Sequence, residues 1–242
     1  MEERNRFDIL ILNARPAAGK SEIIDYLKKC PLNERIERFK IGEFEEIDDF
    51  PILWNWFEED DLLQKMGKPR LHSDEDGYFK EKYFWHLLIQ QMSFEYHKRL
   101  TRLPDYHQEF TTIIEFSRGS EHGGYREAYT HLSREIVQRM AVLYIDVSYE
   151  ESLRKNRARF NPLRPDSILE HGLPDKKMEK LYKEVDWHEI STFDAGYLAV
   201  QGIRVPFVVF ENEDDVTTAR GDALGERLEL KLNHLWRLWL AR

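Results

Sequence analysis

Residues 9–21 read Ile-Leu-Ile-Leu-Asn-Ala-Arg-Pro-Ala-Ala-Gly-Lys-Ser, and residues 22–29 continue as a charged run with one apolar face. The opening apolar run predicts a buried strand, and the spacing of Ile23, Ile24 and Leu27 predicts a helix. A loop of small residues joins the two. This order of strand, loop and helix is the context that a phosphate-binding loop requires, because backbone amides then converge on one point at the helix N-terminus.

Within this loop, Lys20 is spaced to reach the β and γ phosphates of a nucleoside triphosphate, and the Ser21 hydroxyl is spaced to ligate Mg²⁺. The usual pattern begins with glycine, whereas this one begins with Ala14, which is tolerated where the turn does not need a positive φ. The alternative is an ordinary strand-to-helix turn that uses Gly19 only for its backbone. The expected nucleotide-binding residues of the loop are Ala14, Arg15, Pro16, Ala17, Ala18, Gly19, Lys20, Ser21 and Glu22.

The size of the chain, 242 residues, suits one large α/β domain, and we expect a single domain over residues 1–242. No apolar run is long enough to cross a bilayer, and the charged N-terminus does not resemble a secretory signal, so the sequence predicts a cytoplasmic protein. The single cysteine, Cys30, excludes an internal disulfide and is more typical of a small buried side chain than of a catalytic thiol.

The net charge of −9 disfavours a general nucleic-acid surface, because binding to a polyanion needs a concentrated basic face. An acidic chain that binds a nucleoside triphosphate has to concentrate its cations at that one site. The basic residues around Lys20, Arg118 and 154–164 are the candidates for such a concentration.

Strands that alternate with helices predict a mostly parallel sheet, and we expect a three-layer α/β/α sandwich with five strands. The predicted strands are 9–12, 36–42, 109–119, 140–147 and 205–210. The predicted helices are 22–29, 52–66, 78–100, 125–139, 149–160, 175–186 and 216–240. We expect a helical insertion at about 52–101 and a lid at about 149–178.

The acidic segment 43–51 follows the second predicted strand and carries Asp48 and Asp49. Parallel strands deliver such residues to the carboxyl edge of the sheet, which is the edge that binds ligands. A solvated acidic loop is the alternative. The third predicted strand ends in Glu115 and Arg118, which the same rule brings to this edge.

The helix over 149–160 carries three arginines, and Pro-bearing breaks follow it, as in a mobile lid that closes over phosphates. Those arginines are Arg154, Arg157 and Arg159. An ordinary solvated helix face is the alternative. The last helix, 216–240, has an apolar stripe that most simply packs on the core, with a homodimer contact as the other possibility.

Together these segments resemble the P-loop kinases of the nucleoside and nucleotide kinase type. Residues 14–21 look like their phosphate loop, and 113–118 are similar to the strand that ends in an acid and an arginine in deoxynucleoside and thymidylate kinases. Residues 145–159 look like their fourth strand and Arg-bearing lid. Residues 210–214, with Asn212, look like the loop that lies against the adenine.

The resemblance implies ATP and Mg²⁺ as cofactors. Lys20 and the loop amides would hold the phosphates, Ser21 would ligate Mg²⁺, and Glu115 would orient its waters. Arg118 would hold the acceptor, and the lid arginines would close on the transferred group. Relatives that phosphorylate a hydroxyl keep a carboxylate after the second strand, which makes Asp48 or Asp49 the candidate base.

Two functions therefore compete. The first is phosphoryl transfer from ATP to a small-molecule hydroxyl or phosphate, with the acceptor between the carboxyl ends of the second and third strands and walled by the aromatic-rich insertion. The second is a regulatory protein that binds a nucleotide with little or no turnover. A GTPase is disfavoured because the guanine-specific Asn-Lys-x-Asp run is absent.

Overall fold

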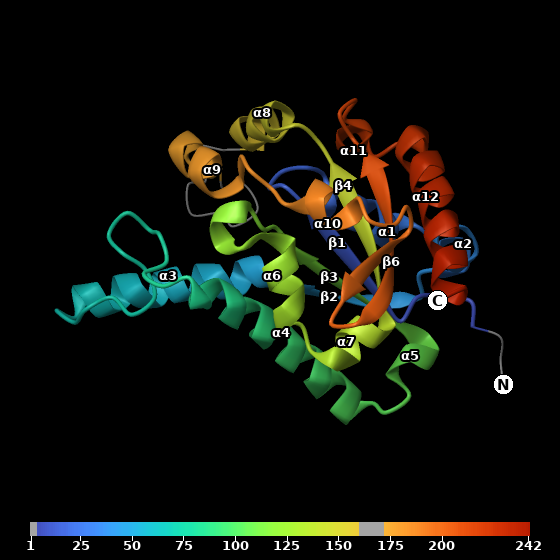
Figure 1. Ribbon diagram of the computed structural model, residues 1–242, viewed down its shortest axis with the longest axis horizontal. Helices are drawn as coiled ribbons and strands as arrows, with labels where there is room; N and C mark the ends of the chain where they lie inside the picture. Colours follow the sequence, from blue (N-terminus) through green and yellow to red (C-terminus); the bar gives the residue numbers. More distant parts are fainter. Residues whose placement is uncertain (1–3, 160–171) are drawn as a thin grey trace.

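The computed structural model describes residues 4–159 and 172–242, and a six-stranded sheet lies at its centre (Figure 1). The strand order is β2-β3-β1-β4-β6-β5; the first five in that order run parallel, and β5 is antiparallel to β6. The strands are β1 (Ile9–Ala14), β2 (Glu43–Asp48), β3 (Phe110–Phe116), β4 (Met140–Asp146), β5 (Tyr197–Val200) and β6 (Ile203–Glu211).

Helices cover both faces of the sheet, which confirms the predicted α/β class. The helices of the first half are α1 (Lys20–Lys29), α2 (Leu32–Phe39), α3 (Asp49–Lys65), α4 (Tyr83–Arg102) and α5 (Tyr106–Glu109). Those of the second half are the 3₁₀ turn η1 (Ser120–His122), α6 (Gly124–His131), α7 (Arg134–Arg139), α8 (Tyr149–Arg159), α9 (Asp175–Tyr182), α10 (Trp187–Ser191), α11 (Val216–Ala219) and α12 (Asp222–Leu240).

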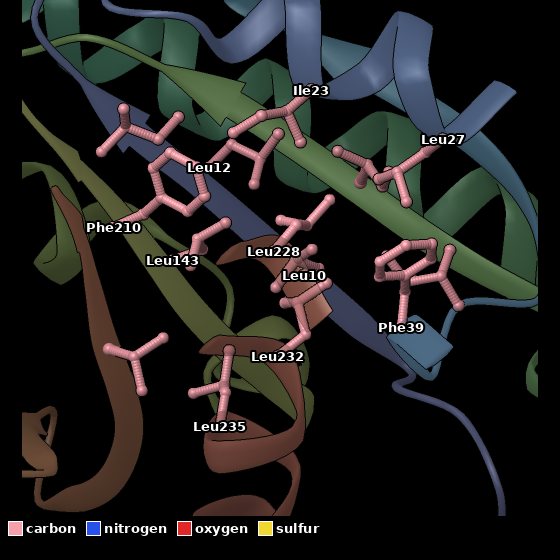
Figure 2. Packing of buried hydrophobic residues seen from close by; sticks show 14 of the residues in the cluster. Leu10, Leu12, Ile23, Leu27, Phe39, Leu143, Phe210, Leu228, Leu232 and Leu235 are labelled. Atoms are coloured by element: carbon pink, nitrogen blue, oxygen red, sulfur yellow. The ribbon is translucent and has the colours of Figure 1, made fainter. Parts of the chain in front are cut away.

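Alternate residues of β1 supply the two cores. Leu10 and Leu12 point to the side of α1 and α12, where they pack in one apolar cluster (Figure 2). Ile9 and Ile11 point to the opposite side and pack with residues of α4, α6 and α7. Because successive side chains of a strand face opposite sides, a continuous apolar run is what a central strand needs when helices cover both faces.

The prediction of a strand at 36–42 was wrong. Residues 32–39 form α2, which begins after Pro31 and ends at Lys40, whose φ of 59° is left-handed. The true second strand is β2, which lies in the segment predicted as an acidic loop and pairs with β3 along one side only. An edge strand leaves one side exposed, so charged side chains are tolerated in it, and the acidic composition concealed the strand.

Other boundaries also differ from the prediction. β5 was not predicted, because four residues joined to β6 by the turn at Gln201 and Gly202, both with positive φ, give little signal. The predicted helix 125–139 is two helices, since Ser133 caps α7 by accepting a hydrogen bond from the Ile136 amide. The last predicted helix is likewise divided at Arg220, and the long helix predicted from residue 78 begins at Tyr83.

Across the described ranges, no helix combines the length and the apolar character that crossing a membrane would need.

Candidate active site

The predicted phosphate loop, residues 14–21, lies between the end of β1 and the start of α1. Gly19 has a φ of 117°, and a Cβ at this position would lie 2.6 Å from the hydroxyl oxygen of Thr217. Glycine is therefore required here by conformation and by space. Ala14 is not among the residues with a positive φ, which explains why alanine is accepted at the first position of the motif.

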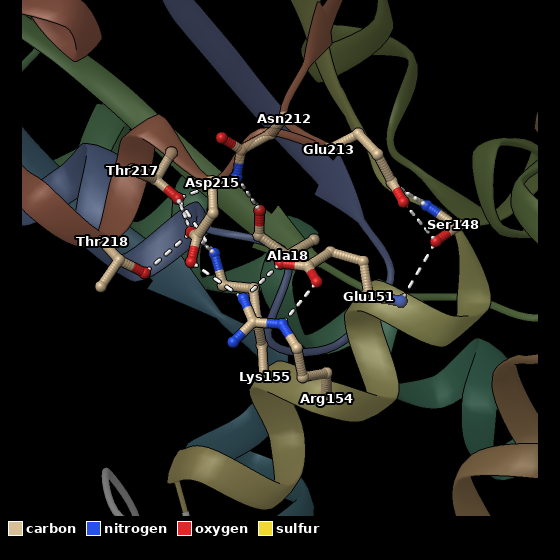
Figure 3. A network of polar contacts seen from close by, with 10 residues as sticks. All are labelled: Ala18, Ser148, Glu151, Arg154, Lys155, Asn212, Glu213, Asp215, Thr217 and Thr218. Atoms are coloured by element: carbon tan, nitrogen blue, oxygen red, sulfur yellow. Dashed lines mark hydrogen bonds and ion pairs between the residues drawn. The ribbon is translucent and has the colours of Figure 1, made fainter.

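Asn212 supports this loop from behind. Its buried side-chain amide donates to the carbonyl oxygen of Ala18 at 2.9 Å and to the hydroxyl of Thr217 at 2.8 Å (Figure 3). The amide nitrogen thus holds the shape of the loop. The contact between Asn212 and an adenine ring stays a prediction.

Arg15 and Pro16, the unusual residues of the loop, are tied to later segments of the chain. The Arg15 guanidinium donates to the carbonyl oxygens of Val147, Tyr182 and Lys183 at 2.9–3.2 Å. The carbonyl oxygen of Pro16 accepts from the hydroxyl of Ser152 on α8 at 2.7 Å. Arg15 therefore acts through its side chain as a clamp between the loop and the segments around α8 and α9.

A cavity of about 250 Å³ opens in front of the loop. We call it the loop cavity; its lining residues are Ala17, Gly19, Lys20, Ser21, Glu22, Arg154, Lys155, Ala158, Arg159, Asp215 and Thr218. The cavity thus brings the start of α1, the basic face of α8 and the segment after β6 together. Backbone amides at a helix N-terminus and several cations on one wall suit a polyphosphate.

Lys155 lies in the basic range 154–164 but was not predicted as a site residue, and it lines this cavity. It is only 7% exposed, and its Nζ lies 2.5 Å from a carboxylate oxygen of Asp215 and 3.1 Å from the Thr217 hydroxyl (Figure 3). The predicted site residues of this helix were its arginines. A lysine is rarely buried without a charged partner, but its burial cannot be recognised from position on a helix alone.

A second cavity, of about 140 Å³, lies across the carboxyl ends of β2 and β3, and we call it the carboxylate cavity. Its polar lining residues are Lys20, Ser21, Asp48, Asp49, Glu115, Ser117, Arg118, Asn156, Arg159 and Tyr182. Lys20, Ser21 and Arg159 line this cavity and the loop cavity alike. The Nζ of Lys20 donates to the Ser117 hydroxyl at 2.9 Å, so β3 fixes the position of the ammonium group.

Asp48 and Glu115 are register partners on the paired strands β2 and β3. Burial raises the pKa of Asp48 to about 8, and the negative charges of Glu115 and Asp49 add to the effect. Burial also raises the pKa of Glu115, although the nearby Lys20 ammonium opposes it. Two carboxyl groups in one poorly solvated place favour a bound cation, and their oxygens are the ligands that Mg²⁺ prefers.

Asp49 has a different partner from Asp48. One of its carboxylate oxygens lies 2.5 Å from the Arg118 guanidinium, and the Arg118 side chain is 2% exposed. The guanidinium also lies over the rings of Trp85 and Phe116, 5.2 and 5.4 Å from their centroids. The predicted acceptor-holding residue Arg118 is thus engaged by one of the two candidate bases, which leaves Asp48 as the better candidate for the base.

The three arginines of the predicted lid lie in different surroundings. Arg154 lines the loop cavity and pairs with Glu151 and Asp215 (Figure 3). Arg159 lines both cavities. Arg157 lines neither cavity and pairs with Asp175 at 2.6 Å. Residues 160–171 of the predicted lid lie outside the described residues.

A third cavity, about 710 Å³ and larger than the other two, lies between α3, the segment before α4, and α9; we call it the aromatic cavity. Its aromatic lining residues are Phe50, Trp54, Phe57, Tyr78, Phe79, Trp85, His122 and Tyr182. Phe50, Leu53, Trp85, Leu173 and Tyr182 also line the carboxylate cavity, so the two adjoin. The insertion at about 52–101, which was predicted to wall the acceptor site, supplies much of the lining.

No model of a known protein family matches the sequence, and no curated protein is significantly similar to it. Among solved structures, a gluconokinase from Sinorhizobium meliloti 1021 aligns over 99% of this chain and 97% of its own, with 13% identity and a TM-score of 0.45. A shikimate kinase from Bacteroides thetaiotaomicron aligns over 95% and 98%, with 14% identity and a TM-score of 0.43. A shikimate kinase from Acinetobacter baumannii, solved with shikimate, aligns over 78% of each chain, with 16% identity and a TM-score of 0.36.

These structural neighbours are P-loop kinases, at low sequence identity.

Proposed function

We propose that the chain transfers a phosphoryl group from ATP to a small-molecule acceptor. The observation that carries the proposal is that Lys20, Ser21 and Arg159 line both the loop cavity and the carboxylate cavity. Phosphoryl transfer needs a donor phosphate and an acceptor oxygen on either side of one charged centre. A wall shared by two polar cavities meets this need.

On the donor side, the loop amides and the Lys20 ammonium bind the phosphates, and Lys155 adds a second cation. Ser21 and Glu115 would hold Mg²⁺, which neutralises charge on the β and γ phosphates when it is bound. The fit is supported by the acids of the carboxylate cavity: burial raises the pKa of both Asp48 and Glu115, and the charge of Asp49 raises each further, so a bound cation would relieve the repulsion.

On the acceptor side, Asp48 takes the proton of the attacking hydroxyl. Burial raises its pKa to about 8, and a cation held nearby by Glu115 would lower the pKa towards neutral pH, where a group is well matched to proton transfer. Asp49 and Arg118 form a buried ion pair, and this pair holds in place the part of the carboxylate cavity that lies beside Asp48. Arg159 faces both cavities and stabilises the charge on the phosphoryl group as it moves.

The acceptor is expected to carry an apolar or aromatic part. The carboxylate cavity, about 140 Å³, has room for a small ring that bears the reacting hydroxyl, and the adjoining aromatic cavity, about 710 Å³, has room for a larger apolar or aromatic part. Cavities of this size with mostly apolar walls bind molecules as large as typical drugs.

The proposal is tested by measuring ADP release from ATP and Mg²⁺ with a panel of hydroxyl acceptors, ranging from small polyols to nucleosides and aromatic alcohols. We expect release with an aromatic acceptor and a loss of about 10²–10⁴-fold in Asp48→Asn, the usual worth of a general base. ATP binding, measured by calorimetry, should persist in this variant. Asp222→Asn, at an exposed position in α12, is the matched control.

The alternative, a nucleotide-binding regulatory protein, is favoured by one observation. Arg154 and Lys155, two cations of the loop cavity, are already paired with acids of the same chain. Binding of ATP without ADP release for any acceptor in the panel would select this alternative. Absence of ATP binding would reject both functions.

A further inference from the structure

Outside the active site, three potential metal ligands meet between α4 and α6, which pack against each other (Figure 1). His86 comes from α4, and Glu127 and His131 come from α6. The two α6 residues are four positions apart and therefore lie on one face of the helix. One ligand atom from each residue lies within 4.8 Å of the others, and His86 Nε2 is 3.0 Å from a carboxylate oxygen of Glu127.

These separations are close to those of an occupied site. A tetrahedral zinc ion with ligands at about 2.0–2.2 Å has ligand atoms about 3.3–3.6 Å apart. Small side-chain rotations bring atoms within 4.8 Å to that spacing. All three side chains are half-buried, which leaves solvent access for entry of an ion and for a water as fourth ligand.

The surroundings hold the carboxylate in place. One oxygen of Glu127 contacts His86, and the other lies 2.8 Å from the Lys82 ammonium. A Cβ at Gly123 would lie 1.6 Å from that second oxygen, so only glycine leaves room for the carboxylate. Such supporting contacts fix ligand orientation in metal sites.

The imidazole rings of His86 and His131 lie close together. They stack with centroids 4.2 Å apart, so a ring must turn before both nitrogen lone pairs point at one ion, and two imidazolium cations would repel each other at this distance. The neutral imidazole is the form that ligates a metal. The amide of Gln90 donates to the His131 carbonyl oxygen at 2.9 Å and ties the end of α6 to α4.

We propose that His86, Glu127 and His131 bind a divalent transition metal, best matched by Zn²⁺. Two imidazoles and one carboxylate suit Zn²⁺, whereas Mg²⁺ and Ca²⁺ prefer oxygen ligands only. The site is therefore distinct in chemistry from the Mg²⁺ site proposed beside the phosphate loop. Lys82 lines the aromatic cavity, so the ion would join α4 to α6 directly behind a wall of that cavity.

The test is calorimetric titration of Zn²⁺ into the untagged full chain, stripped of metal and free of nucleotide. We expect one site of micromolar or tighter affinity and a rise in melting temperature. Co²⁺ in place of Zn²⁺ should give the visible absorption of a low-coordinate site. His131→Ala and Glu127→Gln should each weaken binding by at least about tenfold. Glu127→Gln retains the size of the side chain, which keeps the test valid if a larger truncation unfolds the chain.

His234→Ala and Cys30→Ser are the controls, because exposed histidines and free thiols are common places for adventitious Zn²⁺ binding. Both should bind as the parent chain does. No binding at micromolar Zn²⁺, or equal affinity in the parent, His131→Ala and Glu127→Gln chains, would overturn the proposal. None of these readouts depends on ATP or on turnover.

Discussion

The two sides of the candidate active site are built in different ways. The donor side is one contiguous loop, 14–21, whose shape is fixed by backbone hydrogen bonds and by contacts from Asn212 and Arg15. The acceptor side is assembled from segments far apart in the chain, and its central contact joins Asp49 and Arg118, 69 residues apart. Substitutions on the donor side should therefore change binding of phosphate, whereas those on the acceptor side should change stability as well.

The largest effect on stability is expected from Asp49→Ala. It leaves the Arg118 guanidinium, 2% exposed, without its carboxylate, and breaking a buried pair typically costs about 3–5 kcal/mol. Urea unfolding measures the loss. Asp48→Asn is the matched control, because its neutral side chain can still accept the Phe50 amide hydrogen bond that caps α3. If both variants lose the same stability, the distinct roles assigned to the two acids are wrong.

On the donor side, Lys20→Ala should lower turnover by about 10²–10³-fold, the usual effect of removing one group that stabilises transferred charge. Affinity for ATP and Mg²⁺ should fall as well, while the urea midpoint should stay close to that of the parent chain. Calorimetry and a turnover assay separate these quantities. Lys29→Ala, on the exposed side of the same helix, is the control. Unchanged ATP affinity in Lys20→Ala would contradict the assignment of the phosphate loop.

A smaller loss of stability is expected from removing Asp60, which binds the segment after α3 on the acceptor side. This buried carboxylate accepts the amides of Leu71, His72 and Ser73 and the Ser73 hydroxyl at 2.6–3.1 Å. Asp60→Ala leaves these donors without a partner and should cost about 1–3 kcal/mol. Asp61→Ala is the neighbouring control, since Asp61 is exposed and contacts Arg70 alone among the described residues.

The same carboxylate predicts a pH dependence. Burial acts to raise the pKa of Asp60, but the Ser73 hydroxyl and the three amides outweigh it, and the pKa falls well below its usual range. The stabilisation is therefore present above the unfolded-state pKa of about 3.9 and is lost as the pH falls through the lower folded-state pKa. Asp60→Asn should flatten the acid limb of the stability curve, and an unchanged acid limb would contradict this role.

The sequence could predict the donor side because its information is local. The motif at 14–21 and the apolar periodicities around it specify a strand, a turn and a helix without reference to the rest of the chain. The second strand was predicted at 36–42 because apolar and charged residues alternate there as in a strand. The same apolar residues also fit one face of the helix α2, which is what the segment forms. Lys155 and the pairing of Asp49 with Arg118 depend on tertiary packing, which periodicity does not report.

The smallest effect is expected for Arg157. It lies in the same helix as Arg159 and carries the same charge, but it pairs with Asp175 at the surface and lines neither the loop cavity nor the carboxylate cavity. Exposed ion pairs contribute little, so Arg157→Ala should change turnover by less than about twofold. Arg159→Ala removes a cation shared by both cavities and should lower turnover by at least about tenfold, with ATP affinity less affected, because the charge it stabilises develops during transfer. The ratio of the two turnover numbers shows whether the position of each arginine relative to the cavities matters, or only the total positive charge of α8. Equal losses in the two variants would mean that charge alone matters, and the role given to the wall between the two cavities would then be wrong.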